Sequence, residues 1–551
     1  MIDKITVYVN EIKVALPEGT TLEELSKEYQ KDFKYPIVLA KVNNRIKELS
    51  LIVEENMHIE FLDLTTNEGN RAHISGLILL LDYTIKDIFG NDKEIKVEHS
   101  IDKGIYIKSN FKLTKEKIIK IEEEMQEHIK EELPIMKVNV DRIEAIEYFK
   151  SMNNNVKEGI LKYNTNTYLT LYRLGDLYDY FFTAMPTSTK VLKDFALTFI
   201  SDVGFVLRFP TIYITNKIKE YEHHKAMFQV FNDYESWVEL IKIRNSVDLN
   251  KVIETGKISD LIRINEMLQS NTLLEVAKKI IKRKDKLKIV LLAGPSSSGK
   301  TTTSRKLCMY LKSFGLNPVT LSMDDYFVDR FKTPIDENGK PDFESLKAID
   351  LKLFDKQINQ LLDKEEVNIP TFNFVTGLKE YNLKVKLKEN DIIIVEGIHA
   401  LDPKILTSIE RENKYKIYVS ALTELNIDNH NRISTTDNRL LRRIIRDNRT
   451  RDYNVSKTLD AWSRVREGEE KYIFPYQDEA DYIFNTALIY EIGVLRTYVE
   501  PLLYSVETNS VYYEEAKRLL NFLKNFLPIP SEDIPKDSVL REFIGGSCFH
   551  E

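Results

Sequence analysis

The stretch that decides the fold of the nucleotide-binding part is G-P-S-S-S-G-K-T, residues 294–301. It fits G-x-x-x-x-G-K-[ST] and lies between the apolar run 288–293 and residues 302–307, which can open a helix. Strand, glycine loop and helix in this order predict a phosphate-binding loop, in which backbone N–H groups and the helix amino end surround phosphates. The predicted nucleotide contacts are Gly294, Pro295, Ser296, Ser297, Ser298, Gly299, Lys300, Thr301 and Thr302.

The chemistry of this loop predicts ATP as co-substrate and Mg²⁺ as metal. Lys300 would neutralise the β- and γ-phosphates, and the hydroxyl of Thr301 would hold Mg²⁺. Gly294 and Gly299 permit backbone angles and a close approach that a Cβ atom would prevent.

Composition describes a globular protein with several domains. The 551 residues are 42% hydrophobic and 30% charged, and the chain is too long for one core. Its net charge of −7 gives no general attraction for nucleic acid. Cys308 and Cys548 are the only cysteines, no apolar run reaches the roughly 20 residues of a membrane span, and the first residues lack a signal-peptide core. We therefore expect a cytoplasmic protein with no membrane partner.

Carboxylates end two further apolar runs. Residues 319–327 read as a strand leading into Asp324 and Asp325, and residues 391–398 as a buried strand that ends at Glu396. The carboxyl ends of parallel strands meet at one edge of a sheet, where such folds bind ligands. Asp324 is the predicted base and Mg²⁺ ligand, with Asp325 as the alternative, and Glu396 is a predicted metal ligand. A capping or turn role is the structural alternative for each.

A run of arginines follows in residues 439–451, with Asp447 as its only acid. The first four share one helix face, since they are spaced i, i+3, i+4 and i+7. A solvated surface is the ordinary explanation of such a run, but guanidinium groups suit phosphate oxygens and transition-state charge. We therefore predict a mobile helical lid that closes over ATP. The six arginines are Arg439, Arg442, Arg443, Arg446, Arg449 and Arg451.

Together these segments resemble the uridine kinase and phosphoribulokinase family of P-loop kinases, over about 220 residues. The resemblance implies a parallel sheet flanked by helices. It also implies catalytic roles for Asp324, Lys300, Arg443 and Arg446, ATP contact by Arg449, and metal contact by Thr301, Asp324 and Glu396. Substrate contacts would come from Glu344, Phe372 and Arg451. Phe372 and Gly377 stand where uridine kinases carry a Tyr and a His that read the pyrimidine, so the acceptor stays open.

The first 245 residues resemble modules of tRNA synthetases. Residues 16–22 and 40–44 look like hallmarks of the TGS domain, a small α+β unit. Residues 175–180 and 186–189 look like the α+β second additional domain of threonyl- and alanyl-tRNA synthetases. The metal-binding or catalytic positions of that domain fall on His73, Leu77, Phe181 and Met185. Only one of the four is kept, so we expect a scaffold rather than an editing site.

The expected architecture is multidomain α/β and α+β: residues 1–62 TGS-like, 63–245 synthetase-like, 246–285 a helical connector, 286–505 the kinase domain, and 506–551 a last helix and polar tail. The expected function is ATP-dependent phosphoryl transfer to a hydroxyl of a nucleoside or similar small metabolite, as in uridine kinases. The alternative is an RNA- or nucleotide-sensing regulatory ATPase that uses the first two domains, although the net charge does not support RNA binding. Asp324 with Glu344 suits a small-molecule kinase, and an ATP switch needs neither. The oligomeric state stays open.

Overall fold

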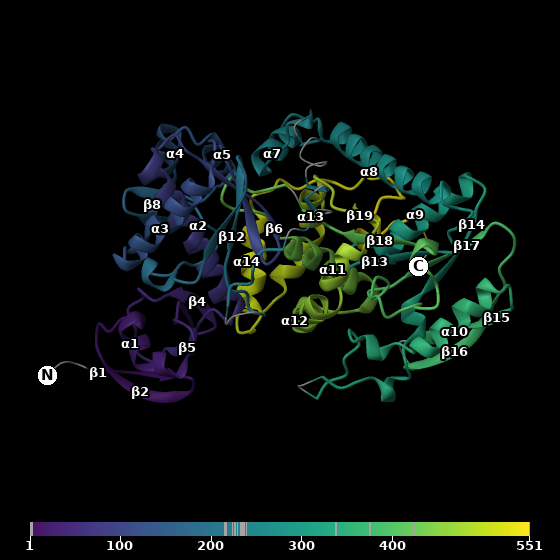
Figure 1. Cartoon of the computed structure of the whole chain (residues 1–551). Helices are drawn as coiled ribbons and strands as arrows, with labels where there is room; N and C mark the ends of the chain where they lie inside the picture. Colours follow the sequence, from purple (N-terminus) through teal and green to yellow (C-terminus); the bar gives the residue numbers. More distant parts are fainter. Residues whose placement is uncertain are drawn as a thin grey trace.

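The structure is a computed structural model. It describes residues 4–549 except 214–216, 223, 225, 226, 229, 232–236, 239, 337, 338, 374, 375 and 424. Residues 4–209 lie on one side of the molecule in Figure 1, and the parallel sheet lies on the other.

The first unit is a five-stranded sheet, in the order β2-β1-β5-β3-β4, covered by one helix. Thr21 begins that helix with a capping box, since its side chain accepts the N–H of Glu24 and the Glu24 side chain accepts its N–H. The elements are β1 (Lys4–Val9), β2 (Ile12–Pro17), α1 (Leu22–Tyr29), β3 (Leu39–Val42), β4 (Arg45–Glu48) and β5 (His58–Leu62).

The second unit packs helices against two antiparallel sheets, ordered β10-β9-β8 and β11-β12-β7-β6. Its long first helix, α2, is buried along most of its length and forms the centre of the core. The elements are α2 (Asn67–Phe89), β6 (Ile95–Ile101), β7 (Gly104–Ser109), α3 (Lys115–Lys130), β8 (Ile135–Asp141), α4 (Arg142–Ser151), α5 (Asn155–Tyr163), β9 (Tyr168–Leu174), β10 (Leu177–Asp179), β11 (Ala196–Ser201) and β12 (Gly204–Arg208).

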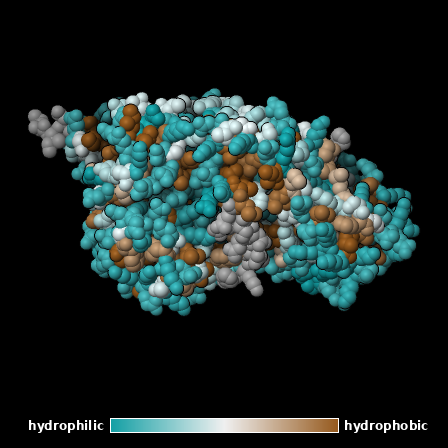
Figure 2. Space-filling model, turned by 90° about the horizontal axis from the view of Figure 1, so that it is seen from above, coloured by the Kyte–Doolittle hydropathy of each residue, from teal (hydrophilic) through white to brown (hydrophobic). Residues whose placement is uncertain are grey.

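Two helices connect this part to the parallel sheet, as the charged helical pattern predicts: α7 (Ser246–Glu254) and α8 (Ile258–Ile281). Helix α8 runs along the top of the molecule in Figure 1. The face seen from above is mostly hydrophilic, with apolar side chains in smaller groups (Figure 2).

The third unit contains a fully parallel five-stranded sheet in the order β14-β17-β13-β18-β19. The central strand, β13 (Ile289–Ala293), is buried throughout, as expected for a parallel sheet covered on both faces. The other strands are β14 (Asn317–Ser322), β17 (Asp391–Glu396), β18 (Lys414–Ser420) and β19 (Tyr482–Asn485), and a separate hairpin pairs β15 (Val367–Asn373) with β16 (Leu378–Val385).

The helices of this unit are α9 (Lys300–Ser313), α10 (Leu351–Leu362), α11 (Thr435–Arg451), α12 (Val455–Tyr472), α13 (Glu491–Tyr504), α14 (Tyr513–Leu523) and α15 (Arg541–Ile544). The last stretch of the chain corrects an expectation. Residues after Pro528 were expected to form a polar tail, but Val539, Leu540 and Phe543 are buried. Leu540 and Phe543 belong to the core that contains α11 and α13, because their apolar side chains fill it.

Candidate functional site

The phosphate loop lies at the carboxyl edge of the parallel sheet, between β13 and α9. Gly299 has φ +84°, in the left-handed region that favours glycine. The Nζ atom of Lys300 donates to the carbonyl oxygens of Gly294 at 2.9 Å and Pro295 at 3.1 Å, so the ammonium lies across the loop. Thr301 is half-buried in the first turn of α9. The strand, loop and helix predicted from the sequence are therefore present.

The structure separates the two adjacent aspartates that the sequence left as alternatives. The Oδ1 atom of Asp325 accepts the backbone N–H of Phe372 at 3.2 Å, so this side chain anchors the hairpin strand β15. Asp324 lies where the positive charges of Lys300 and Arg451 act on it. Loss of hydration raises the pKa of Asp324, and those two cations oppose the rise. This arrangement favours Asp324 as the reactive carboxylate.

Glu396 ends β17 directly beside the loop strand. In the register of the sheet, Glu396 pairs with Leu292 of β13 and with Ser322 of β14. The Oε2 atom of Glu396 is buried without a hydrogen-bond partner among the described residues. Burial raises the pKa of Glu396 to about 7, with Lys300 opposing and Asp324 adding to the rise. A buried oxygen that has no partner in the described part of the chain, and that lies close enough to Asp324 for the two charges to interact, fits the oxygen ligands that Mg²⁺ prefers.

Glu344 lines a cleft of about 1220 Å³ on the other side of the loop. Burial raises the pKa of Glu344 to about 7, and the nearby Glu469 carboxylate adds to the rise while Arg443 opposes it. The cleft also exposes Asp342 and Tyr472. Helix α12 packs tightly here, because a Cβ atom on Gly468 would lie 2.5 Å from Cβ of Glu344. The carboxylate therefore has a fixed place between loop and cleft.

Two of the six arginines hold the loop rather than face solvent. Arg439 and Arg442 are 1% and 0% exposed. The Nε atom of Arg439 donates to the carbonyl oxygen of Ser296 at 2.9 Å, and Nη2 of Arg442 donates to that of Thr486 at 2.9 Å. Their carboxylate partners are Glu469 and Glu491. These buried contacts favour an anchored α11 over the mobile lid expected from the sequence.

The remaining arginines lie at the end of α11 around Asp447. Arg443 donates to Oγ of Ser296 at 2.9 Å, and its Nε lies 3.1 Å from Asp447. Arg446 and Arg451 also pair with Asp447, at 3.0 and 3.4 Å. Arg449 instead donates to the carbonyl oxygens of Glu542 and Phe543, at 2.9 and 3.2 Å. Arg443, Arg446 and Arg451 thus gather beside the loop, and the ATP contact of Arg449 stays a prediction.

Phe372 is buried, whereas its predicted role in substrate binding needs an exposed ring. Its side chain is 4% exposed and packs against Phe327, with ring centroids 5.6 Å apart. Stacking on a substrate base needs an exposed ring face, so this burial indicates a core residue that supports the hairpin. Gly377 has φ +73° in the turn after β15, and residues 374 and 375 before it lie outside the described part.

Glu469 is a site residue that sequence reasoning missed. It is 0% exposed on α12 and accepts the backbone N–H of Ser296 at 3.1 Å while pairing with Arg439 and, at 2.7 Å, with Arg466. The available signal was Arg466 three residues before Glu469, which places both on one helix face. The partner in the phosphate loop, 173 residues away, could not be read from spacing.

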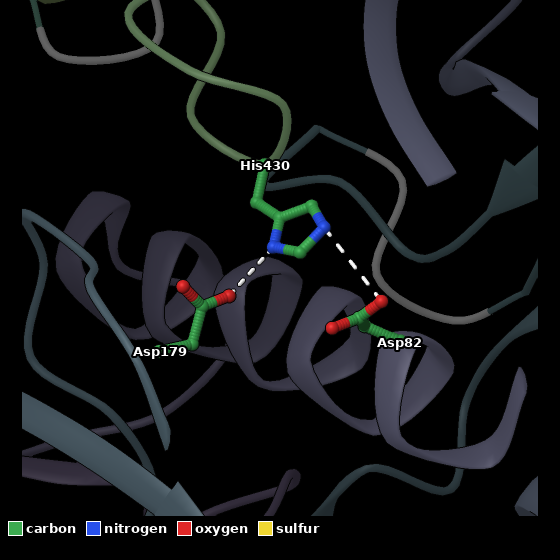
Figure 3. Close-up of side chains that lie close together, drawn as sticks. All are labelled: Asp82, Asp179 and His430. Atoms are coloured by element: carbon green, nitrogen blue, oxygen red, sulfur yellow. Dashed lines mark hydrogen bonds and ion pairs between the residues drawn. The ribbon is translucent and has the colours of Figure 1, made fainter. Parts of the chain in front are cut away.

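A second polar cluster joins the second unit to the loop after β18. His430 lies between two carboxylates, with Nδ1 2.6 Å from Asp179 and Nε2 3.8 Å from Asp82 of α2 (Figure 3). These are ligand types for a metal ion. However, the buried Nζ of Lys157 contacts Asp179 and lies 3.2 Å from Nδ1 of His430. An ammonium therefore already supplies the positive charge that these carboxylates need.

The four positions that correspond to the synthetase editing residues are all buried. His73 and Met185 are 0% exposed, Leu77 is 0% and Phe181 5%. The Nε2 atom of His73 lies 3.4 Å from the carbonyl oxygen of Asp194, and burial lowers the pKa of this histidine to about 4. These four side chains lie in the interior, and the scaffold role expected for this part of the chain stays a prediction.

Comparison with known proteins finds a similarity to kinases in one part of the chain. Residues 289–490 match the model of the phosphoribulokinase / uridine kinase family. Uridine kinases of Staphylococcus aureus strains JH9 and Newman are 29% identical over 196 residues, which cover 35% of this chain and 86% of theirs. Part of the last half of the chain is therefore similar to kinases of this family, and these matches do not specify an acceptor.

Two solved structures match part of the chain. One is a putative fructose transport system kinase from Silicibacter sp. TM1040, with 20% identity and a TM-score of 0.30, covering 38% of this chain and 98% of that chain. The other is a possible uridine kinase from Bacillus stearothermophilus, with 19% identity and a TM-score of 0.26, covering 38% of this chain and 100% of that chain.

Proposed function

We propose that this protein transfers the γ-phosphoryl group of ATP to a hydroxyl of a nucleoside or a similar small metabolite. The observation that carries the proposal is the placement of Asp324, Glu396 and Lys300 together at the carboxyl edge of the parallel sheet, with Glu344 at the adjoining cleft. Phosphoryl transfer needs a carboxylate at the nucleophile and positive charge on the phosphates, and both are provided here.

Each residue has a distinct part in the proposed reaction. Asp324 orients the acceptor hydroxyl and takes its proton as the oxygen attacks. Lys300 moves from the loop carbonyl oxygens to the phosphates, and Arg443, Arg446 and Arg451 stabilise the charge that develops on the transferring group. Glu344 binds acceptor hydroxyls from the cleft. Thr301, Asp324 and Glu396 would hold Mg²⁺, which when bound neutralises phosphate charge.

The acceptor class rests on polar contacts rather than on base stacking. Buried Phe372 offers no ring face, and Gly377 offers no side chain, so nothing at these two positions reads a pyrimidine. The Glu344 carboxylate can still accept hydrogen bonds from hydroxyl groups of the substrate, and this suits a ribose or another polyol.

The test is an ADP-release assay over a panel of nucleosides and sugar phosphates. We expect at least one acceptor to raise turnover above the acceptor-free rate. Lys300→Ala and Asp324→Asn should each reduce that turnover by about 100-fold or more. Asp363→Asn, which changes an exposed aspartate after α10 in the same way, should leave it unchanged.

Two results would count against the proposal in different ways. If no acceptor in the panel raises turnover while ATP is still hydrolysed, the regulatory ATPase becomes the better reading. If Asp324→Asn keeps full activity with an acceptor, the protein is a kinase with a different base.

A further inference from the structure

Residues 535–546, which we call the C-terminal strap, lie against the phosphate loop and α9. Asp537 of the strap pairs with Lys306 of α9 at 3.1 Å. Val539 packs on the loop, because a Cβ atom on Gly299 would lie 2.9 Å from its Cγ2. The Phe543 ring lies under the guanidinium of Arg442, 5.0 Å from centre to centre. The strap is thus in contact with the loop, with α9 and with α11.

One carboxylate of the strap occupies donors of the nucleotide site. The Oε2 atom of Glu542 accepts the backbone N–H of Thr302 at 3.2 Å and its hydroxyl at 2.7 Å. Thr302 is the third residue of α9. The residue before this helix, Gly299, has no side chain that could cap it. The N–H groups at this helix end are the ones that a phosphate-binding loop offers to phosphate oxygens. A carboxylate oxygen therefore lies where a phosphate oxygen would bind.

Hydrogen bonds to the backbone around Glu542 also hold this residue in place. Arg449 donates to the carbonyl oxygens of Glu542 and Phe543, and Nη2 of Arg541 donates to those of Ser531 and Ile534 at 2.7 and 2.9 Å. The negative charge of Glu542 acts on the site. It helps to raise the pKa of Glu396, although burial and Asp324 have larger effects. A bound polyphosphate would meet this charge directly.

We propose that Glu542 competes with nucleotide phosphate for the amino end of α9, so that the C-terminal strap restrains the nucleotide site and nucleotide binding releases it. The inference rests on the proposed function only in requiring that the loop binds ATP or ADP. Two anions cannot share the Thr302 donors, and their mutual repulsion adds to the cost of binding both. Release of Glu542 is therefore coupled to occupation of the loop.

The first measurement is ADP binding by calorimetry to wild type and Glu542→Gln, which keeps the shape of the side chain and removes its charge. We expect Glu542→Gln to bind ADP about tenfold more tightly, because a charged competitor is lost. Glu532→Gln changes an exposed glutamate of the same stretch and should bind ADP as wild type does. Equal affinity in all three proteins, or weaker binding by Glu542→Gln, would overturn the inference.

The second measurement needs no variant and so does not depend on folding of Glu542→Gln. Hydrogen exchange of the backbone amides in residues 537–546 of wild type should become faster when ADP is added, while amides of α9 become slower. Unchanged or slower exchange in residues 537–546 would overturn the inference and leave the kinase proposal standing. If wild type binds no ADP at all, both proposals fail.

Discussion

Glu396 and Glu344 carry the two strongly raised carboxylate pKa values of the candidate site, both about 7. Each is half-buried near other acids, so a large share of each carboxyl group stays protonated at neutral pH. A carboxylate must be ionised to hold Mg²⁺, and metal binding therefore displaces a proton. The ionisation of Glu396 should decide how activity depends on pH.

We expect kcat/KM to rise as pH increases from 6 to 8, because the proton leaves Glu396 as the pH passes its raised pKa near 7. Higher Mg²⁺ should move this rise to lower pH, since the metal competes with the proton. Pre-steady-state or steady-state pH profiles at two Mg²⁺ concentrations measure the shift. In Glu396→Gln the Mg²⁺-dependent shift should vanish, whereas Glu389→Gln, at an exposed glutamate just before β17, should keep it.

Lys157→Met should destabilise the protein strongly, by about 3–5 kcal/mol, because it leaves the Asp179 carboxylate buried without its ammonium partner. Urea denaturation measures the loss. Lys150→Met, at an exposed lysine of α4, should change stability by less than about 0.5 kcal/mol. Adding a chelator such as EDTA to wild type should change nothing; a clear loss of stability would show that Asp82, Asp179 and His430 hold a metal instead.

At the scale of residues, the sequence predicted candidate site residues from local motifs but not the surroundings of these residues. Lys300 and Asp324 followed from motif and strand position, since both depend on local order along the chain. The choice between Asp324 and Asp325 needed the contact of Asp325 with Phe372, 47 residues later. The buried place of Phe372 was also out of reach, because an aromatic residue on a hairpin can face either the core or a ligand.

Helix α11 shows how an element can differ from its sequence pattern. Its arginine spacing correctly predicted one helix, Thr435–Arg451. Its charge predicted a solvated or mobile face, yet Arg439 and Arg442 are buried because carboxylates from other elements meet them. Glu469 and Glu491 lie 30 and 49 residues away in the chain. Spacing within one helix cannot reveal such partners.

A substitution in helix α12 can test how Glu344 is positioned for the acceptor substrate. Gly468→Ala should push Glu344 away, because the new Cβ atom would lie 2.5 Å from Cβ of Glu344. We expect the KM for the acceptor to rise by about tenfold while the KM for ATP changes little. Steady-state kinetics with each substrate varied separates the two effects. Ser463→Ala, at an exposed position of the same helix, is the control and should alter neither KM.

The whole molecule is joined by ion pairs between its first and last parts. Arg71 of α2 pairs with Glu515 of α14 at 2.8 Å, and Arg518 of α14 pairs with Asp437 of α11. The Arg518 and Arg71 charges hold the pKa of Glu515 well below its usual range, against the effect of burial. Among the described residues, no helix is both long and apolar enough to cross a membrane. The resemblance of the first two units to tRNA-synthetase modules stays a prediction.

Buried histidines should make the stability of the whole protein depend on pH. Burial lowers the pKa of His73 to about 4, whereas the unfolded chain has an ordinary histidine pKa near 6.5. The unfolded state therefore binds more protons between these values, and stability falls as pH drops from 6.5 toward 4, by about 1.4 kcal/mol per pH unit for this histidine. Glu344 and Glu396 have raised pKa values in the folded protein, so their contributions to stability increase as pH falls. The pH slope of wild-type stability alone therefore does not test the role of His73.

The test compares the pH slope of stability in His73→Asn with that of wild type. Urea titrations between pH 6.5 and 4.5 should give a slope smaller by about 1.4 kcal/mol per pH unit in the variant. His58→Asn changes a histidine whose side chain is 52% exposed and should keep the wild-type slope. An unchanged slope in His73→Asn would show that this histidine binds its proton in the folded protein too.

The core around α11 has a consequence for the order in which the protein is made. The cores of the first two units use residues 5–61 and 74–209 only, so they can close early during synthesis. The α11 core instead needs Ala516, Leu519, Leu540 and Phe543. Until the ribosome has released that stretch, the arginine helix lacks its apolar cover and Glu542 has not reached the loop. A nascent chain that still lacks residues 516–543 therefore exposes the apolar side of α11 and is prone to aggregation at that stage.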